Sequence, residues 1–438
     1  MEDAEKKAQK RVYAYILVFA ASLLLFFLLF RKFILAVPAA LLLLAVWLLL
    51  DRFFQKNEGT PDSPVYDLIF LLVRLWHGRR PSPIIEDARL KEAETPYVLL
   101  ANHESFFDFY YIHRLHHPRR PTFLVNEFYT TRPILKTLSA KAGILSKKLF
   151  TTDMTSSVRF LRTVRRGVSV VLFPEGRLSP DGRSNPIVEP GGAFYKKLDA
   201  DLVLVKIRGA YFNDPKWRKR RFRQRVRVTV EEVVKKEALR AMTAEALNAR
   251  IAAALFNDAS ENELALYPQK NKAVGLENLL YRCSDCGRLY TTASRGNALF
   301  CTACGSVHTL DAHYRFTGEP KTIADWYARI RELEKPGLDT LCLRAEVRTK
   351  IFGANGGPIR WEEGECELTP AAFSYRSEGG GFTIPLERLP ALAFSCGEEF
   401  ELYHENELHY FYPKENRRQA ARWALAVDLF TARRNGED

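Results

Sequence analysis

The residues of this sequence best suited to do chemistry are His103 and Asp108, which lie five positions apart. They follow a short apolar segment, 97–101, and precede a stretch with a helical pattern. A histidine at a strand end and an aspartate in the first turn of the next helix can meet across the bend between them. The carboxylate would hold one imidazole tautomer, and the other ring nitrogen would take a proton from a hydroxyl. The same spacing is also typical of a histidine in a local turn and an aspartate at a helix N-terminus.

A second motif ends another apolar segment. Residues 168–173 form a run typical of a buried strand, and Pro174, Glu175, Gly176 and Arg177 follow it. Proline ends a strand, glycine lets the backbone approach a ligand closely, and arginine offers a permanent cation whose fork fits phosphate. The four residues would otherwise make an ordinary turn. Two such motifs at predicted strand ends argue against coincidence, because strand ends are where α/β folds place their chemistry.

Together, NHESFFD at 102–108 and FPEGR at 173–177 resemble the glycerolipid acyltransferase family, which includes the 1-acylglycerol-3-phosphate acyltransferases. The resemblance covers roughly residues 85–265. It implies an enzyme that moves an acyl chain from a thioester of coenzyme A or acyl carrier protein to the hydroxyl of a lysophosphatidate-like glycerolipid. Two alternatives stay open: a membrane adaptor with an inactive acyltransferase module, and a thioester or lipid hydrolase that uses the same base on water.

The resemblance also implies roles for single residues. His103 would be the general base, and Asp108 its partner. Glu175, Gly176 and Arg177 would help to bind the glycerol-phosphate part of the acceptor. Ser105 is disfavoured as a nucleophile, because it lies only two residues from the histidine and the chain has no G-x-S-x-G elbow.

Two parts of the family pattern differ here. The family's late Val-Pro-Val strand corresponds to residues 202–206, which hold no proline. The family commonly has a glycine, an apolar pair and an arginine between the two motifs, whereas residues 143–145 are followed by a serine and two lysines. Lys147 and Lys148 are candidates for the missing charge, and so are Arg159 and Arg162. The sequence therefore leaves the identity of the acyl acceptor open.

The N-terminal region predicts a membrane anchor. Residues 13–30 and 33–50 are two uncharged apolar runs separated only by Arg31 and Lys32. Each would be about 27 Å long as a helix, which matches a hydrocarbon core of about 30 Å. A signal peptide is excluded, because the apolar region is too long and a second segment follows at once. We expect a hydrophobic helical hairpin over 12–52 in the cell membrane, with both ends and the catalytic domain on the cytoplasmic face; spanning and one-leaflet insertion stay open.

Two further segments favour a membrane surface. Residues 65–76 are apolar with one Asp and one Arg, and fit either an interfacial helix or a core helix. Residues 216–227 hold eight cations and no acid in a chain of net charge +13. Anionic lipid headgroups or acyl-donor phosphates are the favoured partners of this run. Nucleic acid is disfavoured because aromatic residues are sparse in it.

Four cysteines predict a metal site. Cys283 and Cys286 form one C-x2-C pair, and Cys301 and Cys304 form another. Four thiolates spaced in this way surround Zn²⁺ tetrahedrally, so we expect a structural zinc ribbon over 276–312. A redox pair is disfavoured by the two matched pairs, and a catalytic zinc by the closed set of four ligands.

At 438 residues the chain is too long for one compact core, so we expect several modules. An α/β acyltransferase domain is predicted over 60–270, behind the hairpin and before the ribbon. A helical linker over 322–335 leads to short alternating segments over 338–435 that end in one amphipathic helix. That pattern looks like a C-terminal antiparallel β domain of PH-like architecture.

Overall fold

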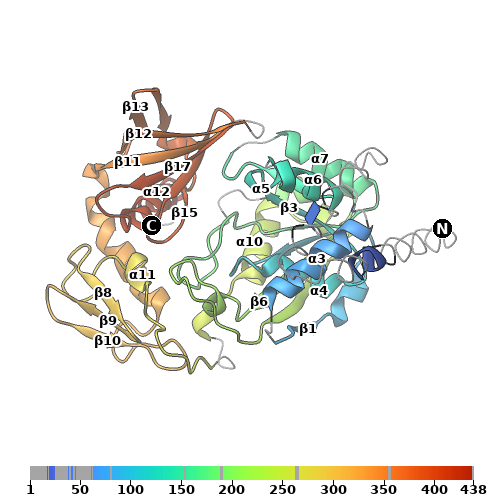
Figure 1. Cartoon of the computed structure of the whole chain (residues 1–438), viewed down its shortest axis with the longest axis horizontal. Helices are drawn as coiled ribbons and strands as arrows, with labels where there is room; N and C mark the ends of the chain where they lie inside the picture. The colour runs from blue at the N-terminus through green and yellow to red at the C-terminus, as the bar shows by residue number, and fades with distance from the viewer. Residues whose placement is uncertain are drawn as a thin grey trace.

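The computed structural model forms two lobes, an α/β lobe and a second lobe that holds a small three-stranded sheet and a larger C-terminal sheet (Figure 1). It describes a few positions between 17 and 45, and residues 61, 63–78, 81–131, 133–151, 154–187, 191–261, 266–353 and 357–436. The hairpin predicted over 12–52 therefore lies outside the described residues, apart from those few positions. Of the helices that the structure describes, none is long and apolar enough to cross a bilayer.

The predicted α/β domain is present as a seven-stranded, mostly parallel sheet. Its strand order is β1 (Ile84–Glu86), β7 (Arg227–Val234), β6 (Asp201–Arg208), β2 (Tyr97–Ala101), β5 (Val170–Leu172), β3 (Thr122–Asn126) and β4 (Leu145–Lys147). Among these strands the one antiparallel pair is β6 with β7, so β7 and its parallel neighbour β1 run opposite to the other five. In the centre, Leu100 of β2 pairs with Leu172 of β5 in parallel register. The two sequence motifs therefore begin within one position of each other at the ends of neighbouring strands.

Helices cover both faces of this sheet, and the alternation of β2 explains why. Leu99 packs on one side with α3 and α4, whereas Leu100 packs on the other side with α7 and α10. These helices are α3 (Ser63–His77), α4 (Asp108–His116), α7 (Met154–Arg165) and α10 (Ala244–Leu255). The shorter helices are α5 (Phe128–Thr131), α6 (Pro133–Lys141), α8 (Gly192–Tyr195) and α9 (Lys236–Ala241). All five residues of β2 are buried, as expected for a strand covered on both faces.

The second lobe begins with the predicted ribbon. Its strands are β8 (Thr292–Arg295), β9 (Ala298–Cys301) and β10 (Val307–Thr309), paired in the order β10-β9-β8. Helix α11 (Ile323–Glu334) follows where the sequence predicts a helical linker. It starts at a capping box in which Thr322 and Asp325 satisfy each other's backbone N–H groups.

The C-terminal antiparallel sheet and its closing helix are also confirmed. The strands are β11 (Leu343–Phe352), β12 (Ile359–Leu368), β13 (Ala372–Ser377), β14 (Gly380–Pro385), β15 (Ala393–Phe394), β16 (Phe400–His404) and β17 (Glu407–Pro413). They pair in the order β14-β13-β12-β11-β17-β16-β15, and α12 (Gln419–Asn435) packs against the sheet. The PH-like classification stays a prediction.

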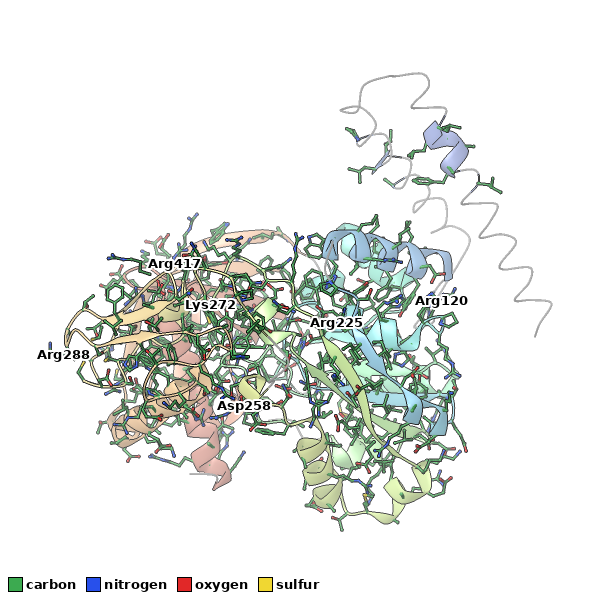
Figure 2. The ribbon with its side chains drawn as sticks, turned by 90° about the horizontal axis from the view of Figure 1, so that it is seen from below. Arg120, Arg225, Asp258, Lys272, Arg288 and Arg417 are labelled. Atoms are coloured by element: carbon green, nitrogen blue, oxygen red, sulfur yellow. The ribbon has the colours of Figure 1, made fainter. Side chains whose placement is uncertain are left out.

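One hydrophobic core runs through the whole second lobe. It contains Tyr281 and Leu299 of the ribbon, Trp326 of α11, Phe400 of β16 and Trp423 of α12. The ribbon is thus stabilised by packing against its neighbours, whether or not it also holds a metal ion. At the boundary with the α/β lobe, Asp258 (Figure 2) receives a hydrogen bond from Arg183, which also donates to Asp325 at the start of α11.

Candidate active site at the ends of strands β2 and β5

The structure brings His103 and Asp108 into direct contact. The imidazole Nδ1 of His103, in the loop after β2, lies 2.9 Å from Oδ2 of Asp108, the first residue of α4. Asp108 is fully buried and also accepts hydrogen bonds from the backbone N–H groups of Glu104 and Ser105 and from the Ser105 hydroxyl. Because an ionised carboxylate can only accept, Nδ1 carries the hydrogen, and Nε2 is the basic nitrogen of the ring.

The second motif holds the backbone of His103 from both sides. The His103 N–H donates to Oε1 of Glu175 at 2.9 Å, and the Ser179 N–H donates to the His103 carbonyl at 3.0 Å. The imidazole also stacks on the ring of Phe173, with 4.2 Å between ring centroids. Even so, 22 % of the side chain stays exposed. The loop therefore fixes the histidine while leaving its ring accessible to a substrate.

Glu175 faces the protein, not the solvent. Its Oε2 accepts from the backbone N–H of Asn185 at 2.6 Å and from the Asn185 side-chain amide at 3.0 Å. Burial raises the pKa of this carboxyl to about 7, although the hydrogen bonds from Asn185 and His103 act to lower it. The sequence predicts that Glu175 binds the acceptor, and that role stays a prediction. The geometry gives the residue a different task, which is to position His103.

Gly176 occupies a backbone conformation that suits glycine. Its φ is +70°, in the left-handed region, and a Cβ placed there would come within 3.1 Å of the Phe150 ring. Phe150 itself has a φ of +55°, which is uncommon for a bulky residue. The Phe150 ring therefore lies directly beside Gly176 and covers one side of the turn that follows β5.

Arg177 turns away from His103 and toward the second lobe. Its guanidinium donates to the Leu392 carbonyl at 3.0 Å and to Oδ2 of Asp428, on α12, at 2.5 Å. Burial acts to lower the pKa of Arg177, but the charge of Asp428 and its hydrogen bond outweigh this, so that the pKa is raised. The cation that the sequence assigns to phosphate is thus engaged by a carboxylate 251 positions later in the chain.

The lysines between the motifs are placed farther along the sheet. Lys147 ends β4, which is separated from β5 by β3. Lys148 donates to the side chain of Asn406, between β16 and β17, and lies 3.9 Å from Glu127. Arg159 and Arg162 are exposed on α7. The structure joins Lys148 to the C-terminal sheet instead of to the His103 loop.

Two further polar residues of the loop anchor it to β6, and the sequence interpretation missed both. The side chain of Asn102 exchanges two hydrogen bonds with the backbone of Ile207. Glu104 is buried and accepts from the N–H groups of Ala210 and Tyr211 and from the Asn257 amide. Burial, reinforced by the nearby Asp108 carboxylate, raises the pKa of Glu104 to about 8. The only signal in the sequence was a cluster of polar residues directly after an apolar strand.

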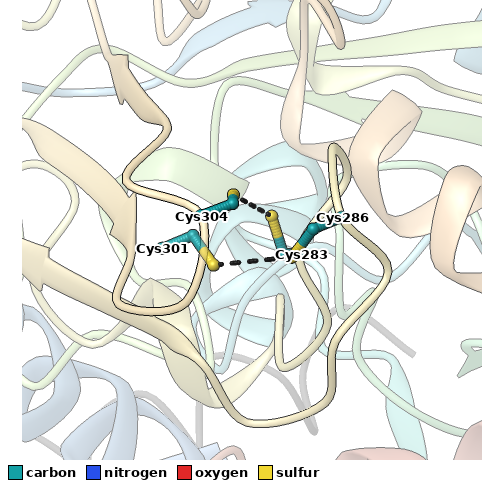
Figure 3. A group of neighbouring side chains, drawn as sticks. All are labelled: Cys283, Cys286, Cys301 and Cys304. Carbon is teal, nitrogen blue, oxygen red and sulfur yellow. Dashed lines mark hydrogen bonds between the residues drawn. The ribbon is translucent and has the colours of Figure 1, made fainter.

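The four predicted metal ligands lie together at one end of the ribbon (Figure 3). The sulfur of Cys283 is 3.8 Å from that of Cys304, and the sulfur of Cys286 is 3.7 Å from that of Cys301. All four sulfur atoms lie within 4.8 Å of one another. Zinc–sulfur bonds of about 2.3 Å in a tetrahedron require sulfur atoms about 3.8 Å apart. The donor set and its spacing therefore fit a four-coordinate metal ion.

Comparison with known proteins finds a family match over part of the α/β lobe. Residues 82–205, which include both motifs, match the family described as Acyltransferase. A chloroplastic 1-acyl-sn-glycerol-3-phosphate acyltransferase of Brassica napus is 28 % identical over 124 residues, 27 % of this chain and 35 % of that protein. The resemblance to the glycerolipid acyltransferase superfamily is thus confirmed, through a domain that spans about a third of that relative.

A solved structure is also similar to part of the chain. It is the 1-acyl-sn-glycerophosphate acyltransferase PlsC of Thermotoga maritima, which is 18 % identical to this chain with a TM-score of 0.38. The match covers 49 % of this chain and 86 % of PlsC.

Proposed function

We propose that this protein is a membrane-associated enzyme that transfers a fatty acyl group from a thioester to the hydroxyl of a lysophosphatidate-like glycerolipid. The donor is an acyl chain on coenzyme A or on acyl carrier protein. The observation that carries the proposal is the position of His103, whose Nδ1 is held by buried Asp108 and whose backbone is held by Glu175. The match of residues 82–205 to the acyltransferase family supports it.

In the proposed reaction His103 acts as a general base. Nε2 takes the proton of the acceptor hydroxyl as that oxygen attacks the thioester carbonyl. The tetrahedral intermediate then collapses, the carbon–sulfur bond breaks, and the imidazolium returns its proton to the departing thiolate. The products are an ester and a free thiol, and the histidine is regenerated. Asp108 stabilises the imidazolium during the step, and a base of this kind contributes about 10²- to 10⁴-fold in rate.

Acceptor binding is the less defined part of the proposal. Phe150 covers one side of the turn at Gly176, and Lys147 at the end of β4 is a candidate cation for the acceptor phosphate. Lys148 would contribute after exchanging its contact with Asn406. An acceptor phosphate would have to replace Asp428 as the partner of Arg177. Glu175 would then affect the substrate indirectly, because it positions His103.

Helix α3 supports attachment to a membrane surface. One side of it is buried in the sheet core, whereas Leu72, Leu75 and Trp76 are exposed, the last two by 68 % and 59 %. The guanidinium of Arg221 lies 5.5 Å from the centre of the Trp76 ring. An apolar helix face flanked by tryptophan and arginine suits the headgroup level of an anionic bilayer. We propose that α3 lies on the cytoplasmic face of the cell membrane, next to the anchor over 12–52.

The basic run over 216–227 divides into two parts. Lys216 donates to the Phe394 carbonyl, and buried Arg218 donates to Tyr314 and to the Phe212 carbonyl. These two residues join the lobes, so neither anionic lipid nor acyl-donor phosphate, the partners predicted for the run, is their partner in this structure. The exposed members, which we propose face anionic lipid, are Lys219, Arg220, Arg221, Arg223 and Arg225.

We further propose that Cys283, Cys286, Cys301 and Cys304 hold a structural Zn²⁺ ion. Four thiolates close the coordination shell, so this ion would supply stability and no open position for a substrate. Its ligands belong to the second lobe, away from the His103 loop.

One experiment separates the proposed reaction from its alternatives. The full chain, in membranes, is supplied with a labelled acyl thioester and a panel of lysoglycerolipids, with His103→Ala as the control. Label in a diacyl product supports the proposal. Label in free fatty acid shows the hydrolase instead, and no consumption of thioester with any acceptor shows the adaptor.

A further inference from the structure

A cavity of about 640 Å³ lies between the two lobes. Of the residues that the structure describes, 149–151 line it from the α/β lobe, and the rest of its described lining belongs to the C-terminal sheet and the turns between its strands. Buried apolar residues form part of that lining, among them Leu389, Ala391, Leu402 and Leu408. The volume is in the range of protein sites that enclose a small organic ligand.

The charges around the cavity exclude one class of ligand. Glu387, Arg388 and Glu405 are exposed where the cavity meets solvent, and Glu401 also lines it. Burial raises the pKa of Glu401 to about 7. Because the exposed carboxylates of Glu387 and Glu405 outnumber Arg388, a phosphate or another anion is not favoured inside. Apolar walls with a charged mouth fit an uncharged aliphatic chain.

A single side chain, that of Phe150, separates the cavity from the turn at Gly176. Phe150 lines the cavity, and the same ring packs against Gly176. On the other side of this turn, Glu175 holds the backbone of His103. Phe150 adopts a left-handed backbone conformation, and such residues persist where the surroundings fix them and cluster at ligand sites.

We infer that this cavity binds the aliphatic chain of one lipid substrate, and that Phe150 is the partition between the chain and the motif turn. The inference rests on the proposed acyl transfer and adds a task for the C-terminal sheet. Most of the lining lies outside residues 82–205, so the acyltransferase domain alone could not form this site. The C-terminal sheet would then set the chain length that the enzyme accepts.

The first test narrows the cavity. Ile384, on β14, is only partly buried and lines the cavity, so Ile384→Trp fills space without replacing a fully buried side chain. Thioesters and lysophosphatidates are each supplied with palmitoyl and octanoyl chains. For the substrate whose chain occupies the cavity, the rate with the palmitoyl chain should fall about tenfold relative to the rate with the octanoyl chain. The matched control is Ile359→Trp on β12, where the side chain is exposed and does not line the cavity. If Ile384→Trp leaves the chain-length preference unchanged for both the thioester and the lysophosphatidate, with transfer intact, the inference would be overturned.

The second test needs no turnover. The full chain in vesicles is irradiated with one of two probes, a palmitoyl thioester or a lysophosphatidate, each with a diazirine at the end of its acyl chain. Adducts on residues 149–151 or 384–391 support the inference, and the probe that forms them tells whether the donor or the acceptor chain occupies the site. Adducts without acyl transfer would leave the cavity assignment standing while the proposed reaction fails. Absence of adducts in these peptides with both probes would overturn the assignment.

Discussion

The loop around His103 and the turn at Arg177 are neighbours at the same edge of the sheet, yet they are held in opposite ways. His103 depends on Asp108 within its own loop and on Glu175 at the end of the adjacent strand. Arg177, two residues after Glu175, depends on Asp428 of the C-terminal helix. Two residues of the second motif therefore have different partners. Glu175 positions the proposed base, His103, and Arg177 pairs with the second lobe.

This difference separates two kinds of effect. Changes around His103 should act on turnover, because its contacts set the position and tautomer of the imidazole. Changes at the Arg177 contact should act first on stability, because a buried ion pair that loses one partner leaves a charge without compensation.

Replacing the proposed base should have the largest effect. His103→Ala removes the nitrogen that accepts the hydroxyl proton, so the rate of transfer should fall by about 10²- to 10⁴-fold. His117→Ala is the matched control, since His117 is exposed at the end of α4. Initial rates and thermal melting measured together separate lost chemistry from lost fold. A folded His103→Ala enzyme with near-normal turnover would contradict the mechanism.

Glu175→Gln should be the next most damaging change. Three N–H groups point at this carboxylate, from His103 and from Asn185, and an amide would turn one of its own donors toward them. The histidine would shift, and a misplacement of about 1 Å costs about 10²-fold in rate. Glu245→Gln, on the exposed side of α10, is the control. Unchanged kcat in Glu175→Gln would show that the carboxylate does not position the base.

The same variant carries a prediction about pH. In the folded protein the pKa of Glu175 is raised from 4.5 to about 7, so the folded chain keeps this proton to higher pH than the unfolded chain. Protonated Glu175 therefore contributes fully to the free energy of unfolding below about pH 4.5. This contribution is lost as the pH rises through about 7. Denaturant unfolding between pH 4 and 8 should show a weaker loss of stability in Glu175→Gln than in the parent. Parallel pH profiles would contradict the raised pKa.

The contact between Arg177 and α12 should affect stability more than chemistry. Asp428→Asn leaves the buried guanidinium without its counter-charge, which should lower the free energy of unfolding by about 3 kcal/mol. Transfer should fall less than in Glu175→Gln, because His103 keeps both of its backbone partners. Asp339→Asn, whose carboxyl is 83 % exposed and pairs with Arg433, should cost about 1 kcal/mol or less. Equal losses of unfolding free energy in Asp428→Asn and Asp339→Asn would contradict the expected difference between a buried and an exposed ion pair.

The sequence predicted those parts of the site that depend on short stretches of chain. His103 and Asp108 were predictable because a strand end and the first helical turn lie within six residues. The ribbon was predictable because metal spacing is a local pattern. The strands of the C-terminal sheet followed from alternation and turn residues, except for β15, whose two residues are too few to show a period.

Long-range partners could not be predicted in this way. Nothing in a lone arginine shows that its carboxylate partner, Asp428, lies 251 positions later. The same holds for Glu104, which accepts from Ala210 and Tyr211 after β6, and for Arg218, which is buried between the lobes in spite of its charge. Local composition predicts exposure for such residues, and only tertiary packing reverses it.

The smallest effect on acyl transfer is expected at the cysteine cluster. Cys286→Ser removes one of four thiolates, so zinc content should drop and residues 276–312 should exchange backbone hydrogen faster, while turnover stays close to that of the parent. The ribbon shares its core with α11 and α12, so the loosening should lower the melting temperature without unfolding the lobe. Cys342→Ser, at an exposed cysteine outside the cluster, is the control. Metal analysis that finds no zinc in the parent would refute the site, and a loss of turnover as large as in Glu175→Gln would show that the ribbon supports His103 as directly as the second motif does.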